Sequence, residues 1–538
     1  MGHMTKKTFF SRYFLLCLLC FPGLLPAQTI VSGGPLKQVQ ANMDIRHYTL
    51  SLSLDPQRQW IGGYTEIDMI LAGPSREILL DLVGQMQVSK VTVDGKTGTF
   101  VHQDQLLWIK SVKEFAPGRH TVKIWYQGIP PLAPRAPWEG GFQWERDSLG
   151  RPWIAISCQS EGGKIYFPCK DHPSDEPDEG ADLLITVPKG LVVAGPGLLQ
   201  QVRHKGSQSE FHWKTRYTIS NYGILFNAGT YKVEKSWYTT VNGNRVPMEF
   251  YVLDYHAHRA PHQLEMLERS ARIQEKYFGE YPWPKEKIGI AETPHLGMEH
   301  QTMNAYGNKF RYTQVGGKDF DWLMHHEFGH EWWGNKVTNK DWAHMWIQEG
   351  ICVFGDALYV REMEGEEAYL ARMRQIARAT KNEKPIVQGD VIDAKATYHA
   401  DIYGKGAFIM HSLRFIMGDS LFFPTLKTLA TDAKYTYGNF VTTTDVEQLF
   451  SGAYGQSLAP IFQLYLRTTS KLDIRVRQLT DDTYEIRLAN AGMDLPIDIQ
   501  TERGIERHVV PAQGIKIISK KVPDIDPIGF YLKVITIH

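Results

Sequence analysis

The chain of 538 residues has no charge excess of either sign, because 59 lysines and arginines balance 59 aspartates and glutamates. Proteins that bind nucleic acid usually carry a basic excess or a basic stripe, and acidic disordered chains carry the opposite. We therefore expect a folded protein with no nucleic-acid partner. The chain also contains no internal repeat and no low-complexity tract, which excludes a repeat array.

Cysteine is scarce as well. Five cysteines are too few to staple a chain of this size, so hydrophobic cores must hold the fold together. The hydrophobic share of 43%, with 14 Trp, 25 Tyr and 24 Phe, supplies the material for such cores. Beyond residue 28 the cysteines are Cys158, Cys169 and Cys352. They allow one disulfide at most, Cys158 to Cys169, and the favoured interpretation is three small buried hydrophobic side chains.

The apolar run near the N-terminus, Tyr13 to Leu25, is shorter than the roughly 20 residues that a membrane helix needs. Three basic residues precede it, and Pro26-Ala27-Gln28 follows with a small residue suited to cleavage. This order predicts a signal peptide within residues 1–28, which begin with a cloning scar at Met1-Gly2-His3 before a native start at Met4, and an uncleaved anchor is the alternative. We expect an exported protein, periplasmic or secreted, with no stable membrane span after cleavage.

The remaining chain divides by its periodicity. At roughly 150 residues per domain, its length suggests three to four domains. Up to residue 232 the pattern is typical of strands, with alternation from Ile45 to Leu52 and again from Thr121 to Trp125. The first stretch with apolar residues at helical spacing runs from His262 to Phe278 and ends at Gly279. We predict an N-terminal β domain over 29–232, a largely helical domain over 233–468 and a small β domain over 469–538, with strands at 472–476, 484–488 and 514–519.

One acidic, proline-rich stretch, Pro173 to Asp182, interrupts the first of these domains. A solvated loop is the favoured interpretation, and a calcium site is the alternative.

The most informative motif is His326-Glu327-Phe328-Gly329-His330, within an amphipathic stretch from Phe320 to Trp333 that predicts a helix. Two histidines four residues apart lie on one face of a helix, so both imidazoles reach one ion. Glu327 projects beside them, where a carboxylate can accept a proton from water activated by the metal. His325 lies off this face.

A catalytic zinc site needs a third protein ligand and an open fourth position. Glu349 follows His330 after 18 intervening residues and begins a second apolar stretch. A helix that returns antiparallel would bring its carboxylate to the two imidazoles. Because apolar residues surround Glu349 in the sequence, its charge needs a partner, and a cation is the obvious one. The pattern predicts one Zn²⁺ per chain, held by His326, His330 and Glu349.

The chain from His326 to Asn335 resembles the metal-binding helix of the aminopeptidase N family, the zinc exopeptidases that include leukotriene hydrolase. Trp346 to Gly350 is similar to the segment of that family that supplies the third ligand, and the spacing of 18 agrees. The resemblance covers residues 44 to about 470. It implies an α+β multidomain fold: an N-terminal antiparallel β saddle, a thermolysin-like, mostly helical catalytic domain and, in this short three-domain form, a small C-terminal β-sandwich.

Three further segments carry the resemblance. Leu296 to His300 resembles the exopeptidase motif, which implies that Gly297 and Met298 pair with the substrate backbone and that Glu299 binds its α-amine. Tyr403 to Ala407 resembles the segment whose tyrosine stabilises the oxyanion, so the family match, and not the spacing, favours Tyr403 over Tyr398. Ser157 to Gln159 resembles the loop of the N-terminal domain that enters the active site, which makes Gln159 a second contact for the amine.

The sequence departs from the family pattern at three positions. Leu296 replaces the first glycine of the exopeptidase motif, His300 replaces its asparagine, and Ser157 stands where the family usually has glutamine. None of these positions is a predicted metal ligand.

The resemblance implies an aminopeptidase that acts on peptides with a free N-terminus, with Glu327 as general base and Tyr403 as the second catalytic residue. We weighed three alternatives: a thermolysin-like endopeptidase, a bifunctional epoxide hydrolase that also cleaves peptides, and a non-enzymatic scaffold. Glu299 argues against the first, and the short tail after residue 468 argues against the second. The complete set of ligands and Glu327 argue against the third.

Overall fold

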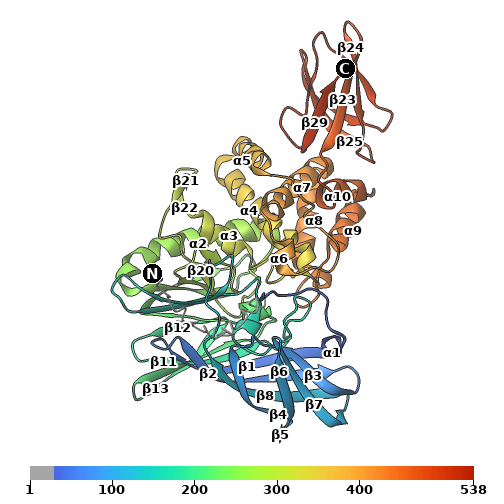
Figure 1. The fold of residues 1–538 in the computed structure, drawn as a ribbon. Helices are drawn as coiled ribbons and strands as arrows, with labels where there is room; N and C mark the ends of the chain where they lie inside the picture. Colours follow the sequence, from blue (N-terminus) through green and yellow to red (C-terminus); the bar gives the residue numbers. More distant parts are fainter. Residues whose placement is uncertain (1–28) are drawn as a thin grey trace, which may run out of the picture.

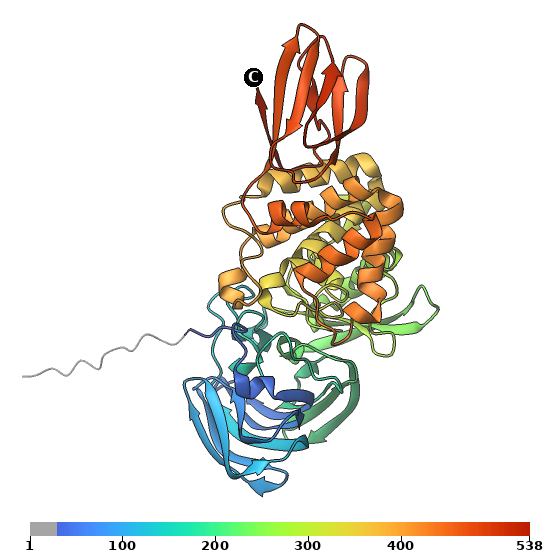
Figure 2. The ribbon, with the colours of Figure 1, turned by 90° about the vertical axis from the view of Figure 1, so that its right-hand side faces the viewer.

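The computed structural model describes residues 29–538 (Figure 1). The predicted signal peptide and cloning scar, residues 1–28, lie outside the described residues. N-terminal β-sheets, a central helical region and C-terminal β-sheets follow one another along the long axis of the molecule (Figure 2). This is the α+β multidomain fold class that the sequence predicts. None of the helices among residues 29–538 has the length and hydrophobicity needed to cross a membrane.

The largest N-terminal sheet has eight strands. In spatial order these are β13 (Leu198–Lys205), β14 (Gln208–Thr215), β11 (Ala181–Pro188), β1 (Met43–Asp55), β2 (Trp60–Leu71), β8 (Gly118–Gly128), β4 (Met86–Val93) and β5 (Lys96–Thr97). Buried and partly exposed residues alternate along β1 and β8, as the period of two predicts. The sheet differs from the expected antiparallel saddle at one pair, because β1 and β11 are parallel. The chain reaches β11 only after the long excursion from 129 to 180, which allows the strands to run the same way.

Two smaller sheets complete the N-terminal part. One contains β3 (Ser75–Asp81), β7 (Leu106–Phe115) and β6 (Thr99–Gln103), next to the short helix α1 (Gln38–Ala41). The other contains β12 (Val192–Ala194), β15 (Asn227–Gly229), β10 (Pro152–Ser157) and β9 (Gly141–Arg146). The second sheet matters for function, because Gln159 follows directly after β10.

The central part begins with a five-stranded sheet. Its order is β16 (Tyr231–Thr239), β17 (Arg245–Leu253), β18 (Ile288–Glu292), β20 (Asn304–Tyr306) and β19 (Gly297–Met298), which leaves β19 at an edge. A small hairpin of β21 (Thr313–Val315) and β22 (Lys318–Phe320) follows. The helices are α2 (Ala260–Phe278), α3 (Trp322–Gly329), α4 (Trp346–Glu364), α5 (Glu366–Ala379), α6 (Ala394–Thr397), α7 (Asp401–Met417), α8 (Asp419–Thr431), α9 (Thr443–Tyr454) and α10 (Ala459–Leu466).

Helix α2 agrees with the predicted helix, but α3 is shorter than the predicted stretch from Phe320 to Trp333. Strand β22 occupies Phe320, and Asp321 then caps the helix by accepting a hydrogen bond from the Met324 backbone amide at 3.2 Å. At the other end the chain leaves the helix after His330, and Gly334 turns it with a φ of 120°. The ends of α3 are therefore set by a side-chain cap and a turn.

The C-terminal part consists of two small sheets. One has the order β27 (Ile515–Ile518), β24 (Thr483–Leu488), β23 (Leu472–Thr480) and β29 (Lys533–Ile537), and the other β26 (Gly504–Val510), β25 (Leu495–Thr501) and β28 (Asp524–Ile525). The three strands predicted here are present. Buried residues such as Ile474, Ile486 and Ile499 form the core between the sheets.

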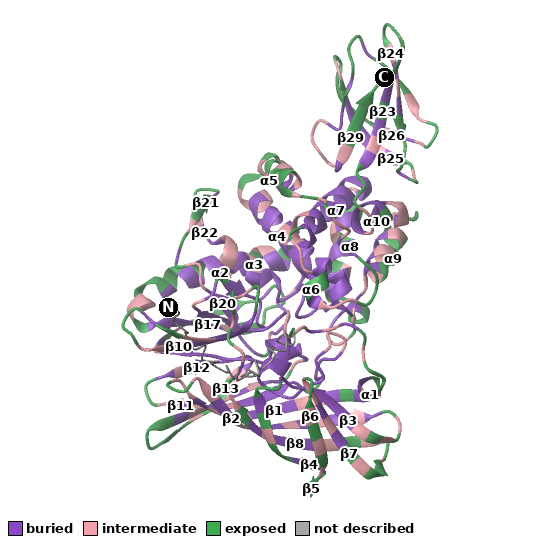
Figure 3. Cartoon of the chain, viewed as in Figure 1, coloured by how far each residue is buried: buried purple, intermediate pink, exposed green. Residues whose placement is uncertain are grey.

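The N-terminal segment ties the β-sheets to the helical region, where buried residues are dense (Figure 3). Ser32 donates its backbone amide to Ser160 at 2.8 Å and accepts from the Ala394 amide at 3.1 Å. Gly33 lies against the Trp342 indole, so closely that a side chain there would collide with it. One short segment thus connects the loop after β10 with the helical part.

The acidic stretch 173–182 is only partly solvated as expected: Asp178 and Glu179 are exposed, but Asp175 and Glu176 are buried. Lys170 contacts the Asp175 carboxylate at 2.9 Å, and Thr218 and Thr338 donate to Glu176 at 3.1 and 3.0 Å. Burial raises the pKa of Glu176 to about 8. Composition alone could not predict Thr218 and Thr338 as partners, because they come from distant parts of the chain. The cysteines follow the favoured interpretation: Cys158, Cys169 and Cys352 are buried and free.

A single carboxylate connects three strands of the large sheet. Asp182 of β11 contacts His47 of β1 at 3.0 Å, and it accepts from His212 and Lys214 of β14 at 2.5 and 2.7 Å. Burial opposes ionisation of Asp182, but the hydrogen bonds from these side chains outweigh it and hold the pKa of Asp182 well below its usual value.

We predict that Asp182→Asn lowers the free energy of unfolding at neutral pH by about 2 kcal/mol, because charge-assisted hydrogen bonds are lost. A depressed pKa stabilises the fold above the usual value of about 4, and this contribution is lost as the pH falls further. The variant should therefore show a flatter decline of melting temperature below about pH 4 than the parent protein. Equal acid sensitivity of the two proteins in thermal unfolding would contradict this assignment.

Candidate metal centre and substrate cleft

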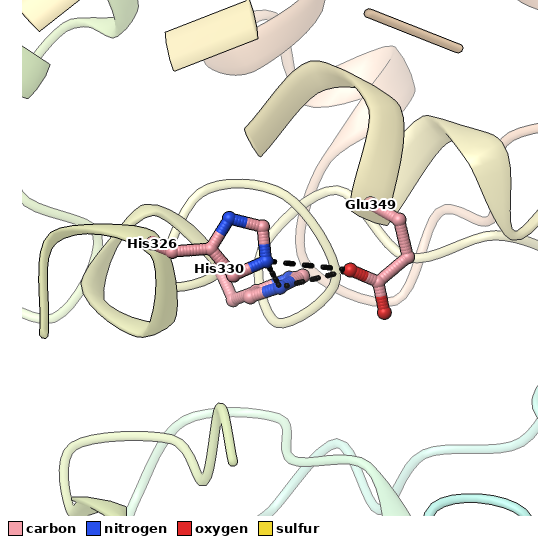
Figure 4. A group of neighbouring side chains, drawn as sticks. All are labelled: His326, His330 and Glu349. Atoms are coloured by element: carbon pink, nitrogen blue, oxygen red, sulfur yellow. Dashed lines mark hydrogen bonds and ion pairs between the residues drawn. The ribbon is translucent and has the colours of Figure 1, made fainter. Parts of the chain in front are cut away.

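Helix α3 presents both histidines of the motif on one face. His326 lies in the last turn of the helix, and His330 follows one turn later as its cap. Their Nε2 atoms are 3.3 Å apart (Figure 4). His325 points elsewhere, as predicted, because its ring packs on Phe320 and Tyr359.

Glu349 reaches the same point from the first turn of α4. Its Oε2 lies 3.5 Å from Nε2 of His326 and 3.4 Å from Nε2 of His330 (Figure 4). The three ligand atoms lie within 4.8 Å of one another, as a metal site requires. Zinc bonds of about 2.0–2.1 Å at tetrahedral angles place donor atoms about 3.3–3.4 Å apart, close to the distances found.

The bonding state of the Glu349 carboxylate also suits a cation. Its Oε2 is buried and has no hydrogen-bond donor among the described residues. Burial opposes the ionised form, but the two imidazoles lower the pKa of Glu349 to about 2. A buried carboxylate oxygen without a donor is costly unless a cation satisfies it, so the donor set fits zinc.

Neighbouring groups turn both imidazoles toward the common point. His326 Nδ1 donates to Asp356 of α4 at 3.1 Å, and His330 Nδ1 donates to the Trp333 carbonyl at 2.9 Å. These bonds select the tautomer that leaves Nε2 free to bind a metal. The motif did not reveal Asp356, although its position seven residues after Glu349 places it on the same side of α4.

Glu327 lies between the two histidines and lines the same cavity. Its carboxylate sits directly against Gly297, where any side chain would collide with Oε1. Burial raises the pKa of Glu327 to about 8, against the lowering effect of the imidazoles. A cation held by the neighbouring ligands would favour the ionised form of Glu327, which is the form that can accept a proton.

Glu299 and Gln159 meet although 140 residues separate them. Gln159 Nε2 donates to Glu299 Oε1 at 2.5 Å, and the Tyr222 hydroxyl donates to the same oxygen at 3.0 Å. The Asn335 side chain donates to the Glu299 carbonyl at 2.8 Å, which fixes the end of β19 relative to α3. No motif of the sequence pointed to Tyr222.

Tyr403 reaches the centre from α7. Its ring centroid lies 6.2 Å from that of His326, and its hydroxyl is 2.9 Å from the Tyr398 hydroxyl. Helices α4 and α7 cross at two glycines, since a Cβ on Gly350 would lie 2.6 Å from Cα of Gly406. This close approach, which larger residues would prevent, places Tyr403 and Glu349 at one cavity.

The cavity has a volume of about 570 Å³. All nine residues predicted for the site line it: Gln159, Gly297, Met298, Glu299, His326, Glu327, His330, Glu349 and Tyr403. Residues that sequence reasoning missed line it as well, namely Arg135, Pro137, Trp138, Ser160, Leu323, Tyr398 and Ala400. The structure thus brings the predicted set together, while the catalytic and binding roles of its members remain predictions.

Two of the departures from the family pattern have different surroundings. Leu296 lines the cavity and remains 42% exposed. His300 is buried, and neither ring nitrogen has a hydrogen-bond partner among the described residues, so burial lowers its pKa. His344 contacts Thr443 at 3.0 Å and does not line the cavity.

Comparison with known proteins also points to a metallopeptidase. The peptidase family M1 domain matches residues 262–465. Aminopeptidase N of Escherichia coli is 28% identical over 226 residues, which are 39% of this chain and 26% of that protein. Leukotriene A-4 hydrolase of Xenopus laevis is 23% identical over 338 residues, 60% of this chain and 52% of that protein. The chain thus matches between a quarter and about a half of the length of these relatives.

A solved structure extends the likeness beyond the catalytic region. The M1 zinc metallopeptidase of Deinococcus radiodurans superimposes with a TM-score of 0.68, at 22% identity, over 81% of this chain and 96% of that one. A mutant of that enzyme has been solved with a Tyr-Ser-Ala substrate. At this identity the superposition establishes the fold. The matched region, residues 262–465, spans α3, α4 and α7, which carry the His-His-Glu group and Tyr403, so the similarity to peptidase family M1 includes the candidate metal centre.

Proposed function

We propose that this protein is a zinc-dependent aminopeptidase that removes the N-terminal residue from peptides. One observation carries the proposal: Glu299 and Gln159 close one side of the same cavity that holds His326, His330 and Glu349. A buried carboxylate beside the metal ligands binds an ammonium group, which only the first residue of a peptide carries on its backbone. Aminopeptidases among the relatives and the tripeptide bound to a solved relative support this proposal.

The cavity residues divide the work of hydrolysis. His326, His330 and Glu349 would hold the ion, which when bound supplies Lewis acidity that polarises the scissile carbonyl and acidifies water. Glu327 accepts the proton of the attacking water at its carboxylate and delivers it to the leaving amine. Tyr403 donates its hydroxyl hydrogen to the carbonyl oxygen, and this bond strengthens as negative charge develops there.

The position of the peptide along the cavity would be set by Glu299 and strand β19. Burial raises the pKa of Glu299, and an incoming ammonium stabilises its ionised form. Gly297 and Met298 form the edge strand β19, whose free side offers backbone groups to an extended peptide. A peptide held at Glu299 by its amine and along β19 by its backbone would present its first carbonyl to the metal centre.

A thermolysin-like endopeptidase, the main alternative function, would need a differently shaped site. A thermolysin-like endopeptidase requires a cleft that continues past the first residue, whereas Glu299, Gln159 and Tyr222 occupy that end here. Equal cleavage of free and N-acetylated peptides by the protein would favour that rival and end the aminopeptidase proposal. Export of the protein, inferred from residues 1–28, is a separate proposal.

We predict that Glu327→Gln lowers kcat by about a thousandfold or more, because the amide cannot accept the proton of the attacking water. The side chain is isosteric and is not a ligand, so the zinc content should stay at one per chain. Turnover of an aminoacyl amide and metal analysis of the same preparation test both parts. Turnover near that of the parent protein would show that another group is the base.

We predict that Glu299→Gln raises KM for aminoacyl substrates by about tenfold or more, through loss of the charged partner of the amine. Zinc content and melting temperature serve as controls, since Gln159 and Tyr222 can still donate to the remaining amide oxygen. If KM stays constant and only kcat falls, Glu299 does not bind the amine.

A further inference from the structure

The loop 131–140 lies at the cavity although no motif marked it. Arg135, Pro137 and Trp138 from this loop all line the cavity with the metal-binding group. Trp138 is 46% exposed, and the Arg135 side chain is 67% exposed. Tryptophan and arginine often contribute most of the binding energy when a partner covers them. Their exposure at this cavity therefore points to contact with a ligand.

The backbone holds this loop in place. Arg135 and Glu139 pair through both backbone amides, at 3.4 and 3.0 Å, and Ala133 donates to the Phe142 carbonyl at 3.0 Å. At its base, a Cβ on Gly141 would come within 2.5 Å of the Ala133 amide. The loop is therefore pressed against β9, the neighbour of the strand that leads to Gln159. The backbone that carries the Arg135 side chain is therefore held in a fixed position.

Among the charged residues that line the cavity, glutamates outnumber lysine and arginine. Three carboxylates, Glu299, Glu327 and Glu349, surround the metal-binding group, while Arg135 is the single lysine or arginine that lines the cavity among the described residues. Its guanidinium contacts the exposed Glu139 at 3.0 Å and lies 5.9 Å from the Trp138 ring centroid. An exposed ion pair contributes little to stability, and it leaves several N–H donors of Arg135 free.

The direction of a bound peptide follows from β19. If the amine is held at Glu299, an antiparallel peptide runs past Met298 and Gly297 toward Leu296 and the rim. Leu296 and Trp138 then face its second and third side chains. The backbone of a tripeptide extends about 10 Å, and a cavity of 570 Å³ falls within the range of small-ligand sites.

We propose that Arg135 binds the C-terminal carboxylate of short peptides, so that the preferred substrates are peptides of about three residues with a free C-terminus. This inference rests on the proposed aminopeptidase function and specifies its substrate class. Guanidinium and carboxylate pair through two parallel hydrogen bonds. This contact with the C-terminus would favour peptides of one length. Glu139 competes with the substrate for the same guanidinium.

The test compares Ala-Ala-Ala with its C-terminal amide as substrates for the full-length zinc protein, following release of the first alanine. The parent protein should show a kcat/KM about tenfold higher for the free acid, through a lower KM. Arg135→Gln should bring the ratio close to one. Glu139→Gln should raise it, because the competing carboxylate is gone. Arg146→Gln, on the adjoining strand but outside the cavity, is the matched control and should leave the ratio unchanged.

The outcomes separate this inference from the proposed function. If the parent protein releases alanine equally well from both peptides, or if Arg135→Gln leaves a strong preference for the acid intact, the role of Arg135 is wrong and the aminopeptidase proposal survives. If the parent protein with full zinc content releases no N-terminal residue from either peptide, both proposals fail. Arg135→Lys should retain part of the preference, since it keeps the charge and loses the paired geometry.

Discussion

The structure is organised around one buried carboxylate, that of Glu349. Its Oε2 lies within 3.5 Å of two imidazole nitrogens and accepts no hydrogen bond within residues 29–538. Removing such a charge from water costs several kcal/mol, and this cost is recovered only by a well-placed positive partner. A dication at the shared point provides that partner, and it explains why α3 and α4 expose ligand atoms toward each other while apolar side chains surround them.

Once this point is fixed, the other parts of the site are placed by contacts with the same elements. The segment after α3 carries Glu331, which accepts from the Trp283 indole at 2.7 Å and from the Thr302 amide at 2.9 Å. Asn335, four residues later, holds the Glu299 carbonyl. Glu299, the carboxylate proposed to bind the amine, is therefore connected to the metal-binding residues through one short segment of chain. The glycines at which α4 and α7 cross do the same for Tyr403 on the other side.

How far the sequence predicts this site depends on the range of the interactions. The His-His-Glu group could be predicted because its members sit on two consecutive helices, and because helical spacing places His326 beside His330. Glu299, Gln159 and Tyr403 required a family resemblance, since nothing local distinguishes Tyr403 from Tyr398. Tyr222 and Arg135 were missed, because their approach to the site depends on how the N-terminal sheets pack on the helices. The same reason explains the acidic stretch 173–182, whose partial burial depends on Thr218 and Thr338.

The N-terminal β region therefore contributes residues to the candidate site itself. Gln159 lines the cavity, Tyr222 donates a hydrogen bond to the lining residue Glu299, and three residues of the loop 131–140 line the cavity as well. An exopeptidase must recognise a terminus while leaving the bond next to it open to attack, which requires charged groups on one side and a metal on the other. For the proposed aminopeptidase these two requirements fall on different sheets and helices, so substrate register would depend on the contact between them. Ser32 strengthens that contact, since it bonds both the loop after β10 and the start of α6. Under the proposed function, variation in the loop 131–140 would therefore change which peptides fit, while the metal-binding residues on α3, at its C-cap and on α4 stay in place.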